Sequence, residues 1–115
     1  MFANLQNEDI NNKIINKLKE YNSQKEYFFT TVNPKDNTFE ETRYWRGPVW
    51  INTNWIIYQG LINKDKNFSE LLKNKTLELL ENKNFHEYYN FKNGDCLGAN
   101  NFSWSAALYL DLKFN

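Results

Sequence analysis

The segment Tyr44–Leu61, with the sequence YWRGPVWINTNWIIYQGL, is the most informative part of this 115-residue chain. Its first part carries rings, arginine and glycine, and its second part is largely apolar. Pro48 suits the first turn of a helix, where an N–H group would lack a partner anyway. We therefore expect a helix over Val49–Leu61 that is buried on most sides, with its few polar residues facing a cavity or another helix.

Three further segments are predicted to be helical. Apolar residues recur at helical spacing over Glu8–Asn22 and indicate an amphipathic helix with one buried face. Asn67 begins a variant of the capping box and predicts a helix from there to about Asn82. Asn100 or Asn101 could cap a final helix, NFSWSAALYLDL, whose small and apolar residues indicate burial on several sides.

The remaining segments are expected to be loops or extended chain. Tyr27–Val32 is rich in aromatic and β-branched residues and indicates either a short strand or an extended lining segment. Asn33–Arg43 has no period and predicts a loop. Asn84–Asn101 is a long irregular segment with turn signals, and loops of such length are often functional. The predicted fold class is all-α, with four helices joined by two long aromatic loops.

The composition excludes several classes of protein. Fourteen basic and fourteen acidic side chains give a net charge of zero, which argues against nucleic-acid and acidic-membrane partners. No apolar run is long enough to span a bilayer. The sequence starts without the pattern of a secretory signal, and its one cysteine, Cys96, fits a reducing compartment. The expected location is the cytoplasm.

Aromatic residues make up 17% of the chain although its mean hydropathy is strongly negative, at −0.79. An ordinary small core is built mainly from Leu, Ile and Val. Flat apolar rings beside many amide and carboxylate groups suit a sugar-binding surface, although the composition alone does not establish one.

The first candidate site is the start of the opening segment, at the junction between a loop and a helix. Tyr44, Trp45 and Trp50 offer flat apolar faces there, and Arg46 could donate paired hydrogen bonds to hydroxyl or carboxylate oxygens. The alternative is that the rings fasten the start of the helix to the core while Arg46 caps carbonyl groups.

The second candidate is Glu87, which lies among the rings of Phe85–Asn90, FHEYYN. Partial desolvation by such rings suits a carboxylate that takes part in proton transfer. The alternative is a surface glutamate in a loop. A third candidate is Trp104, which could face a pocket from the final helix. One histidine and one cysteine do not form a metal site, so neither a metal nor a cofactor is expected.

In this order and spacing, three segments resemble the C-terminal part of the (α/α)6-barrel glycoside hydrolases of family 63. These include mannosylglycerate hydrolase-like and processing α-glucosidase-like enzymes. The segments are YWRGPVWINTNWIIYQGL, FHEYYN and NFSWSAALYLDL, and the resemblance covers roughly residues 28–112.

The resemblance implies an inverting hydrolase of α-linked glucosides or mannosides. Glu87 would be the general base that activates water. Tyr44, Trp45, Arg46 and Trp50 would bind the sugar, with Trp104 near the same pocket. The family's general acid is an aspartate upstream of the matched segments, and no aspartate here occupies the matching position. By the resemblance, half of the catalytic pair is missing.

The expected architecture is one domain, residues 1–115, equivalent to the closing hairpins of a partial (α/α)6 toroid. Its predicted helices bury more surface than four helices can cover, so we expect self-association or docking to the missing part of a barrel, with a carbohydrate as ligand. One alternative is a non-catalytic carbohydrate-binding or assembly module. A weaker alternative is a small helical scaffold whose rings only form the core.

Overall fold

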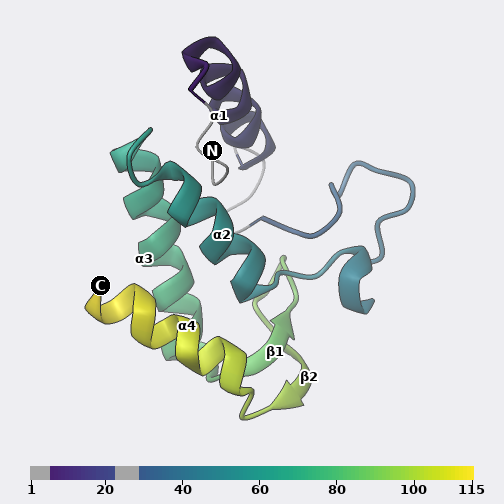
Figure 1. The fold of residues 1–115 in the computed structure, drawn as a ribbon. Helices are drawn as coiled ribbons and strands as arrows, with labels where there is room; N and C mark the ends of the chain where they lie inside the picture. The colour runs from purple at the N-terminus through teal and green to yellow at the C-terminus, as the bar shows by residue number, and fades with distance from the viewer. Residues whose placement is uncertain (1–5, 23–28) are drawn as a thin grey trace.

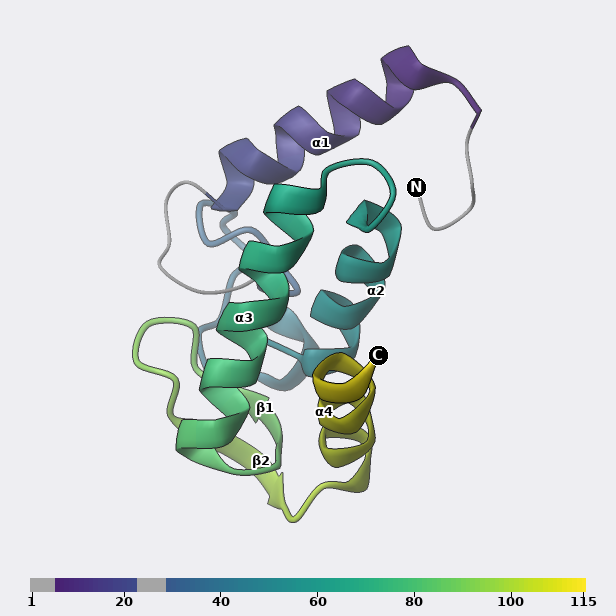
Figure 2. The ribbon, with the colours of Figure 1, turned by 90° about the vertical axis from the view of Figure 1, so that its left-hand side faces the viewer.

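The structure, a computed structural model, describes residues 6–22 and 29–115. Its elements are α1 (Glu8–Asn22), the 3-10 helix η1 (Tyr44–Arg46), α2 (Ile51–Leu61), α3 (Lys66–Lys83), β1 (His86–Tyr89), β2 (Cys96–Asn100) and α4 (Ser103–Phe114). Helix α2 packs along α3, and α4 contacts both (Figure 1). Figure 2 shows α1 at one end of the molecule and the two strands at the other.

The four predicted helices are confirmed, but α2 begins later than expected. The chain is extended at Pro48 and Val49, so Pro48 does not occupy a first helical turn. Val49 exchanges both backbone hydrogen bonds with Tyr89, at 2.8 and 2.9 Å. This pairing holds the backbone of Val49 in the β region, and the helix can start only after Trp50.

The predicted N-caps of the last two long helices are wrong. Asp65, not Asn67, caps α3, because its carboxylate accepts a hydrogen bond of 3.0 Å from the Phe68 amide. Helix α4 follows Phe102, and neither Asn100 nor Asn101 caps it. The Phe102 amide instead donates to the Phe85 carbonyl, so α4 is fastened to the chain just before β1.

The all-α prediction omitted a two-stranded antiparallel sheet within the supposed loop Asn84–Asn101. Strand β1 pairs with β2, and the turn between them contains Gly94 at a φ of +70°. Of the predicted extended segment Tyr27–Val32, Tyr27 and Phe28 lie outside the described residues. Thr30 forms an isolated antiparallel bridge with Val49, so Val49 is paired on both sides.

The core has two apolar clusters. One lies where α1, α2 and α3 meet; its buried members are Ile15, Phe29, Tyr58, Leu61, Phe68, Leu72 and Leu112. The other lies between the start of α2, the end of α3 and β1; its buried members are Val49, Ile51, Leu79, Leu80 and Tyr89. The second cluster forms the floor beneath the candidate site.

One face of α4 carries several exposed apolar side chains. Trp104, Ala107, Leu110 and Phe114 follow one another at helical spacing on this face, and we call them the α4 stripe. Leu110 is 56% exposed and Phe114 is 75% exposed. Contiguous exposed apolar surface of this kind usually marks an interaction site. Among the described residues, no helix is both long enough and apolar enough to span a bilayer.

Asn54 fastens the extended chain before the first loop to α2. Its amide oxygen accepts from the Phe29 N–H at 2.9 Å, and its amide nitrogen donates to the Phe29 carbonyl at 3.0 Å. A third bond runs from the same nitrogen to the Trp50 carbonyl, at 2.9 Å. Asn54 is only 1% exposed, so water cannot replace these partners.

We predict that Asn54→Ala lowers the free energy of unfolding by about 2–4 kcal/mol, because it leaves the buried Phe29 N–H and C=O unpaired. Urea unfolding monitored by tryptophan fluorescence measures the loss. Asn52→Ala on the same helix is the matched control, since the buried Asn52 Oδ1 has no hydrogen-bond partner among the described residues. Equal losses in the two variants would contradict the bridging role of Asn54.

Candidate functional site

The site forms where two segments far apart in sequence are paired. Val49 follows the loop that carries Tyr44 and Trp45, and Tyr89 ends β1. Their reciprocal backbone hydrogen bonds place the residues next to them, Trp50 and Tyr88, side by side. The first predicted site, around Tyr44–Trp50, and the hairpin that carries Glu87 are therefore parts of one structure.

Three rings form a continuous stack at this junction. The rings of Trp45 and Trp50 lie 3.6 Å apart with an interplanar angle of 12°. Those of Trp50 and Tyr88 lie 5.1 Å apart at 16°. Trp50 is 2% exposed in the middle of the stack, whereas Trp45 is 40% exposed. Trp50 is thus the packed support, and part of the Trp45 side chain is accessible to solvent.

Tyr44 closes one side of the stack. Its ring meets Trp45, Trp50 and Tyr88 edge-on, at centroid distances between 5.0 and 5.7 Å. The Trp50 indole donates to the Tyr44 carbonyl at 3.0 Å, which fixes the backbone of η1 over the stack. Tyr44 has a positive φ of 34°, which is uncommon for a bulky residue, and its ring is 49% exposed.

Gly47 allows the loop before it to fold back onto the end of η1. A Cβ at this position would lie 2.1 Å from the Glu40 carbonyl oxygen, so no larger residue fits without movement of the backbone. The Glu40 amide in turn donates to the Arg46 carbonyl at 2.7 Å. Glycine is therefore needed at position 47 because of the space and not because of the backbone conformation, since any residue can adopt its φ of 171°.

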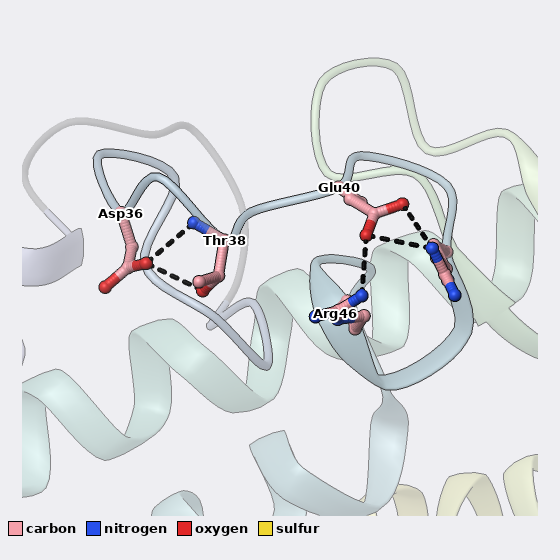
Figure 3. A network of polar contacts seen from close by, with 5 residues as sticks. Asp36, Thr38, Glu40 and Arg46 are labelled. Atoms are coloured by element: carbon pink, nitrogen blue, oxygen red, sulfur yellow. Dashed lines mark hydrogen bonds and ion pairs between the residues drawn. The ribbon is translucent and has the colours of Figure 1, made fainter.

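Arg46 is held by Glu40 at the surface (Figure 3). The Arg46 Nη1 lies 3.0 Å from one carboxylate oxygen of Glu40, and Arg43 binds both oxygens of the same carboxylate at 3.1 Å. These side chains are 41–62% exposed, so the ion pairs contribute little stability. The guanidinium of Arg46 keeps other N–H donors for a ligand.

Glu87 lies in the middle of β1 and is half-buried. Its Oε2 accepts a hydrogen bond of 3.0 Å from the Ala99 amide on β2. Within the described part of the chain, no residue donates to the other oxygen, Oε1. Glu87 is thus a strand residue and not the loop residue of the alternative interpretation. One of its oxygens is anchored and the other is available to a water molecule.

The carboxylate of Glu87 lies close to the ring of Tyr88, which is the last ring of the stack. A Cβ placed on Gly98 would be 2.7 Å from Glu87 Oε2 and 2.6 Å from Tyr88 Cε1. Glu87 Oε2 and Tyr88 Cε1 both lie within these distances of the same point, so their separation cannot exceed the sum of the two distances. Since Tyr88 stacks on Trp50, the carboxylate borders the aromatic surface.

Trp104 makes none of the ring contacts that join Tyr44, Trp45, Trp50 and Tyr88 in the described part of the chain. Its ring is 47% exposed and contacts Phe102 at 6.5 Å. No ring contact joins Trp104 to the stack in the described ranges. Tyr44, Trp45 and Trp50 are brought together, with Arg46 beside them, while Trp104 belongs to the α4 stripe.

Sequence reasoning missed three residues that shape the site. Tyr88 completes the stack, Gly98 makes room for Glu87, and Ala99 donates to its carboxylate. Tyr88 could have been found, because it belongs to the same aromatic run as Glu87. Gly98 and Ala99 carried no signal, since their role depends on the pairing of β2 with β1.

The hairpin is fixed from below by Tyr89. The Tyr89 hydroxyl donates to the Asn84 carbonyl at 2.6 Å and accepts from the His86 amide at 2.8 Å. The Ser105 hydroxyl of α4 donates to the His86 carbonyl at 2.6 Å. Burial raises the pKa of Tyr89 to about 12. Among the described residues, no group of three or more His, Cys, Asp or Glu side chains could hold a metal ion.

We predict that Tyr89→Phe destabilises the chain near neutral pH by about 1–3 kcal/mol, because the His86 N–H and the Asn84 carbonyl lose their partner. The stability that neutral Tyr89 provides is complete below its unfolded pKa of about 10 and is lost as the pH rises toward 12. Urea unfolding at pH 8 and pH 11 should therefore show that the free energy of unfolding falls less between these two pH values in the variant than in the wild type.

Tyr109→Phe is the control for this comparison, since the Tyr109 hydroxyl donates to Glu81 at the surface. In this variant the free energy of unfolding should fall between pH 8 and pH 11 as much as in the wild type. An unchanged alkaline decline in Tyr89→Phe would contradict the role of the buried hydroxyl.

Comparison with known proteins identifies one family. Residues 1–105 match the model of the mannosylglycerate hydrolase MGH1-like glycoside hydrolase domain. A mannosylglycerate hydrolase of Thermus thermophilus is 46% identical over 87 residues, which are 73% of this chain and 20% of that protein. A glucosylglycerate hydrolase of Mycolicibacterium hassiacum is 32% identical over 82 residues, or 70% of this chain and 18% of that protein.

The fold is also found in solved structures. A GH63 mannosylglycerate hydrolase from a second strain of Thermus thermophilus, in complex with Tris and D-glycerate, matches with a TM-score of 0.88 and 35% identity. The match covers 95% of this chain and 27% of that one. The chain spans about a fifth of the length of the curated relatives that it matches.

Proposed function

This chain belongs to the mannosylglycerate hydrolase MGH1-like glycoside hydrolase family, and we propose that it supplies one half of the active site of an inverting hydrolase. The substrate class is α-linked mannosides or glucosides, with mannosylglycerate and glucosylglycerate as the first compounds to test. One observation carries the proposal: the Val49–Tyr89 pairing joins an aromatic stack to the strand that holds Glu87.

In this proposal Glu87 is the general base. Its anchored oxygen, Oε2, fixes the carboxylate, and Oε1 accepts the proton of the attacking water. The exposed side of Trp45 and the ring of Tyr44 bind the apolar face of the pyranose, with Trp50 as their support. Arg46 binds a hydroxyl or carboxylate group of the substrate. The positive φ of Tyr44 supports this assignment, because strained residues cluster at functional sites.

The general acid comes from outside these residues. An inverting hydrolase needs a second carboxyl group about 6.5–9.5 Å from the base. Asp36, Asp95 and Asp111 are poor candidates because each already holds a structural contact. Asp36 accepts from Thr38, Asp111 accepts from the Trp55 indole at 2.7 Å, and Asp95 accepts from Asn93 and pairs with Lys83. We assign the acid to the larger part of the enzyme, which the relatives possess and these residues do not span.

The α4 stripe is the proposed contact with that larger part, or with another copy of the chain where the larger part is absent. Its exposed Trp, Leu and Phe side chains would be costly to leave in water. The position of Trp104 on this stripe favours a role in docking and places it second to Trp45 as a sugar-binding residue. The complete assembly would be an (α/α)6 toroid.

A non-catalytic carbohydrate-binding or assembly module is the second candidate. It is favoured by the same aromatic stack together with the structural contacts that already engage Asp36, Asp95 and Asp111. In that case the rings would bind sugar, and Glu87 would act only as a hydrogen-bond acceptor.

Complementation tests the catalytic proposal. A Thermus thermophilus mannosylglycerate hydrolase truncated to lack the part that this chain matches should be inactive alone, as should this chain. Their mixture should release sugar from mannosylglycerate. Glu87→Gln should lower the rate of the mixture by about 10²–10⁴-fold, because it removes the base while keeping the size of the side chain.

Glu70→Gln, on the exposed side of α3, is the matched control and should leave the rate unchanged. Full activity of the mixture containing Glu87→Gln would contradict the role of Glu87. Efficient hydrolysis by the 115-residue chain alone would contradict the external origin of the acid.

A charge on the α4 stripe tests the docking proposal. The wild-type chain should self-associate in sedimentation experiments, and Leu110→Glu should make it monomeric and prevent complementation. Leu71→Glu is the matched control, because Leu71 is 46% exposed on α3, outside the stripe. A wild-type chain that stays a well-folded monomer, together with a Leu110→Glu variant that complements as well as the wild type, would contradict this role of the stripe.

A further inference from the structure

We infer that Gly98 and Ala99 form the device that positions the Glu87 carboxylate. The inference rests on the proposed role of Glu87 as general base. Strand β2 has one more residue than β1 at this point: His86 pairs with Asn100 and Tyr88 with Leu97, so Gly98 and Ala99 both oppose Glu87. This is a β-bulge, a feature that often redirects a side chain beside a functional site.

Gly98 is the residue that makes the bulge possible. Its φ of +70° lies in the left-handed region, which side chains disfavour. A Cβ there would be 2.7 Å from Glu87 Oε2, 2.8 Å from Glu87 Cβ and 2.6 Å from Tyr88 Cε1. The space is filled by the base and by the last ring of the stack. Only a hydrogen atom fits between them and the backbone of β2.

The bulge turns the Ala99 amide toward the carboxylate. The amide donates to Oε2 at 3.0 Å, and a backbone donor cannot rotate away as a side chain can. The second oxygen, Oε1, stays available for water. The same glycine contacts Tyr88, so one backbone feature sets the distance between the base and the sugar-binding stack.

Gly98→Ala tests the inference, and Gly94→Ala is its matched control. Both glycines have a φ of +70°, so both variants carry the same kind of backbone strain. The new methyl group at Gly94 would meet only the ends of the Leu79 and Lys83 side chains, at 3.1 and 3.6 Å. The methyl group at Gly98 would displace Glu87 and Tyr88. A difference between the variants therefore reports positioning and not general strain.

The first readout is the ¹H–¹⁵N signal of the Ala99 amide in the 115-residue chain, followed as a function of pH. In the wild type and in Gly94→Ala the amide proton should shift as its carboxylate partner gains a proton. In Gly98→Ala and Glu87→Gln this shift should disappear. A wild-type Ala99 signal that ignores pH, or an unchanged shift in Gly98→Ala, would overturn the inference.

The second readout is the rate of the complemented enzyme on mannosylglycerate. Gly98→Ala should lower kcat about 10²-fold relative to Gly94→Ala, the loss expected for a reacting group misplaced by about 1 Å. Equal kcat values for the two glycine variants, beside an inactive Glu87→Gln, would overturn the positioning role alone. If Glu87→Gln is active while the Ala99 amide signal of the wild type still responds to pH, the proposed function is overturned and the hydrogen bond to Glu87 remains supported.

Discussion

The backbone pairing of Val49 with Tyr89 holds the parts of the candidate site together. It joins the loop before α2 to the strand before the hairpin turn, and Thr30 extends the pairing on the other side of Val49. Because neighbouring residues follow their backbone, Trp50 and Tyr88 must stack once this pair forms. Both Val49 and Tyr89 are fully buried, so the hydrogen bonds are shielded from water and the floor of the site is rigid.

Two glycines allow close approach of the backbone in the segments that form the site. Gly47 leaves room for the Glu40 carbonyl, and Gly98 leaves room for the side chains of Glu87 and Tyr88 against β2. The Glu87 carboxylate and the backbone of Tyr44 are thus held by main-chain or ring contacts, whereas Arg46 is held by the side chain of Glu40. Preorganisation of this kind is what a site needs in order to stabilise a transition state. The strained φ of Tyr44 fits the same pattern.

The sequence predicted the helices well and the pairing poorly. The bounds of α1 agree with the prediction, because apolar residues on one face give a clear period. The hairpin was missed because its strands are short, its rings occupy both faces, and the bulge at Gly98 breaks the alternation. The rings around Trp50 and the carboxylate of Glu87 were predicted as site residues from residue types and family resemblance. Their supports, Glu40, Tyr88 and the Ala99 amide, depend on long-range contacts that a sequence pattern does not report.

The central claim is that Glu87 and the aromatic stack contact the same sugar ring. A crystal structure of the complemented enzyme with bound glucose tests it most directly. We expect a pyranose whose apolar face lies on Trp45 and Tyr44 and whose anomeric carbon faces Glu87 Oε1 across a single water molecule. A sugar bound elsewhere, or a Glu87 carboxylate more than about 10–12 Å from the rings of Tyr44, Trp45 and Trp50, would contradict the claim, because the base of an inverting hydrolase must reach the ring that the subsite holds.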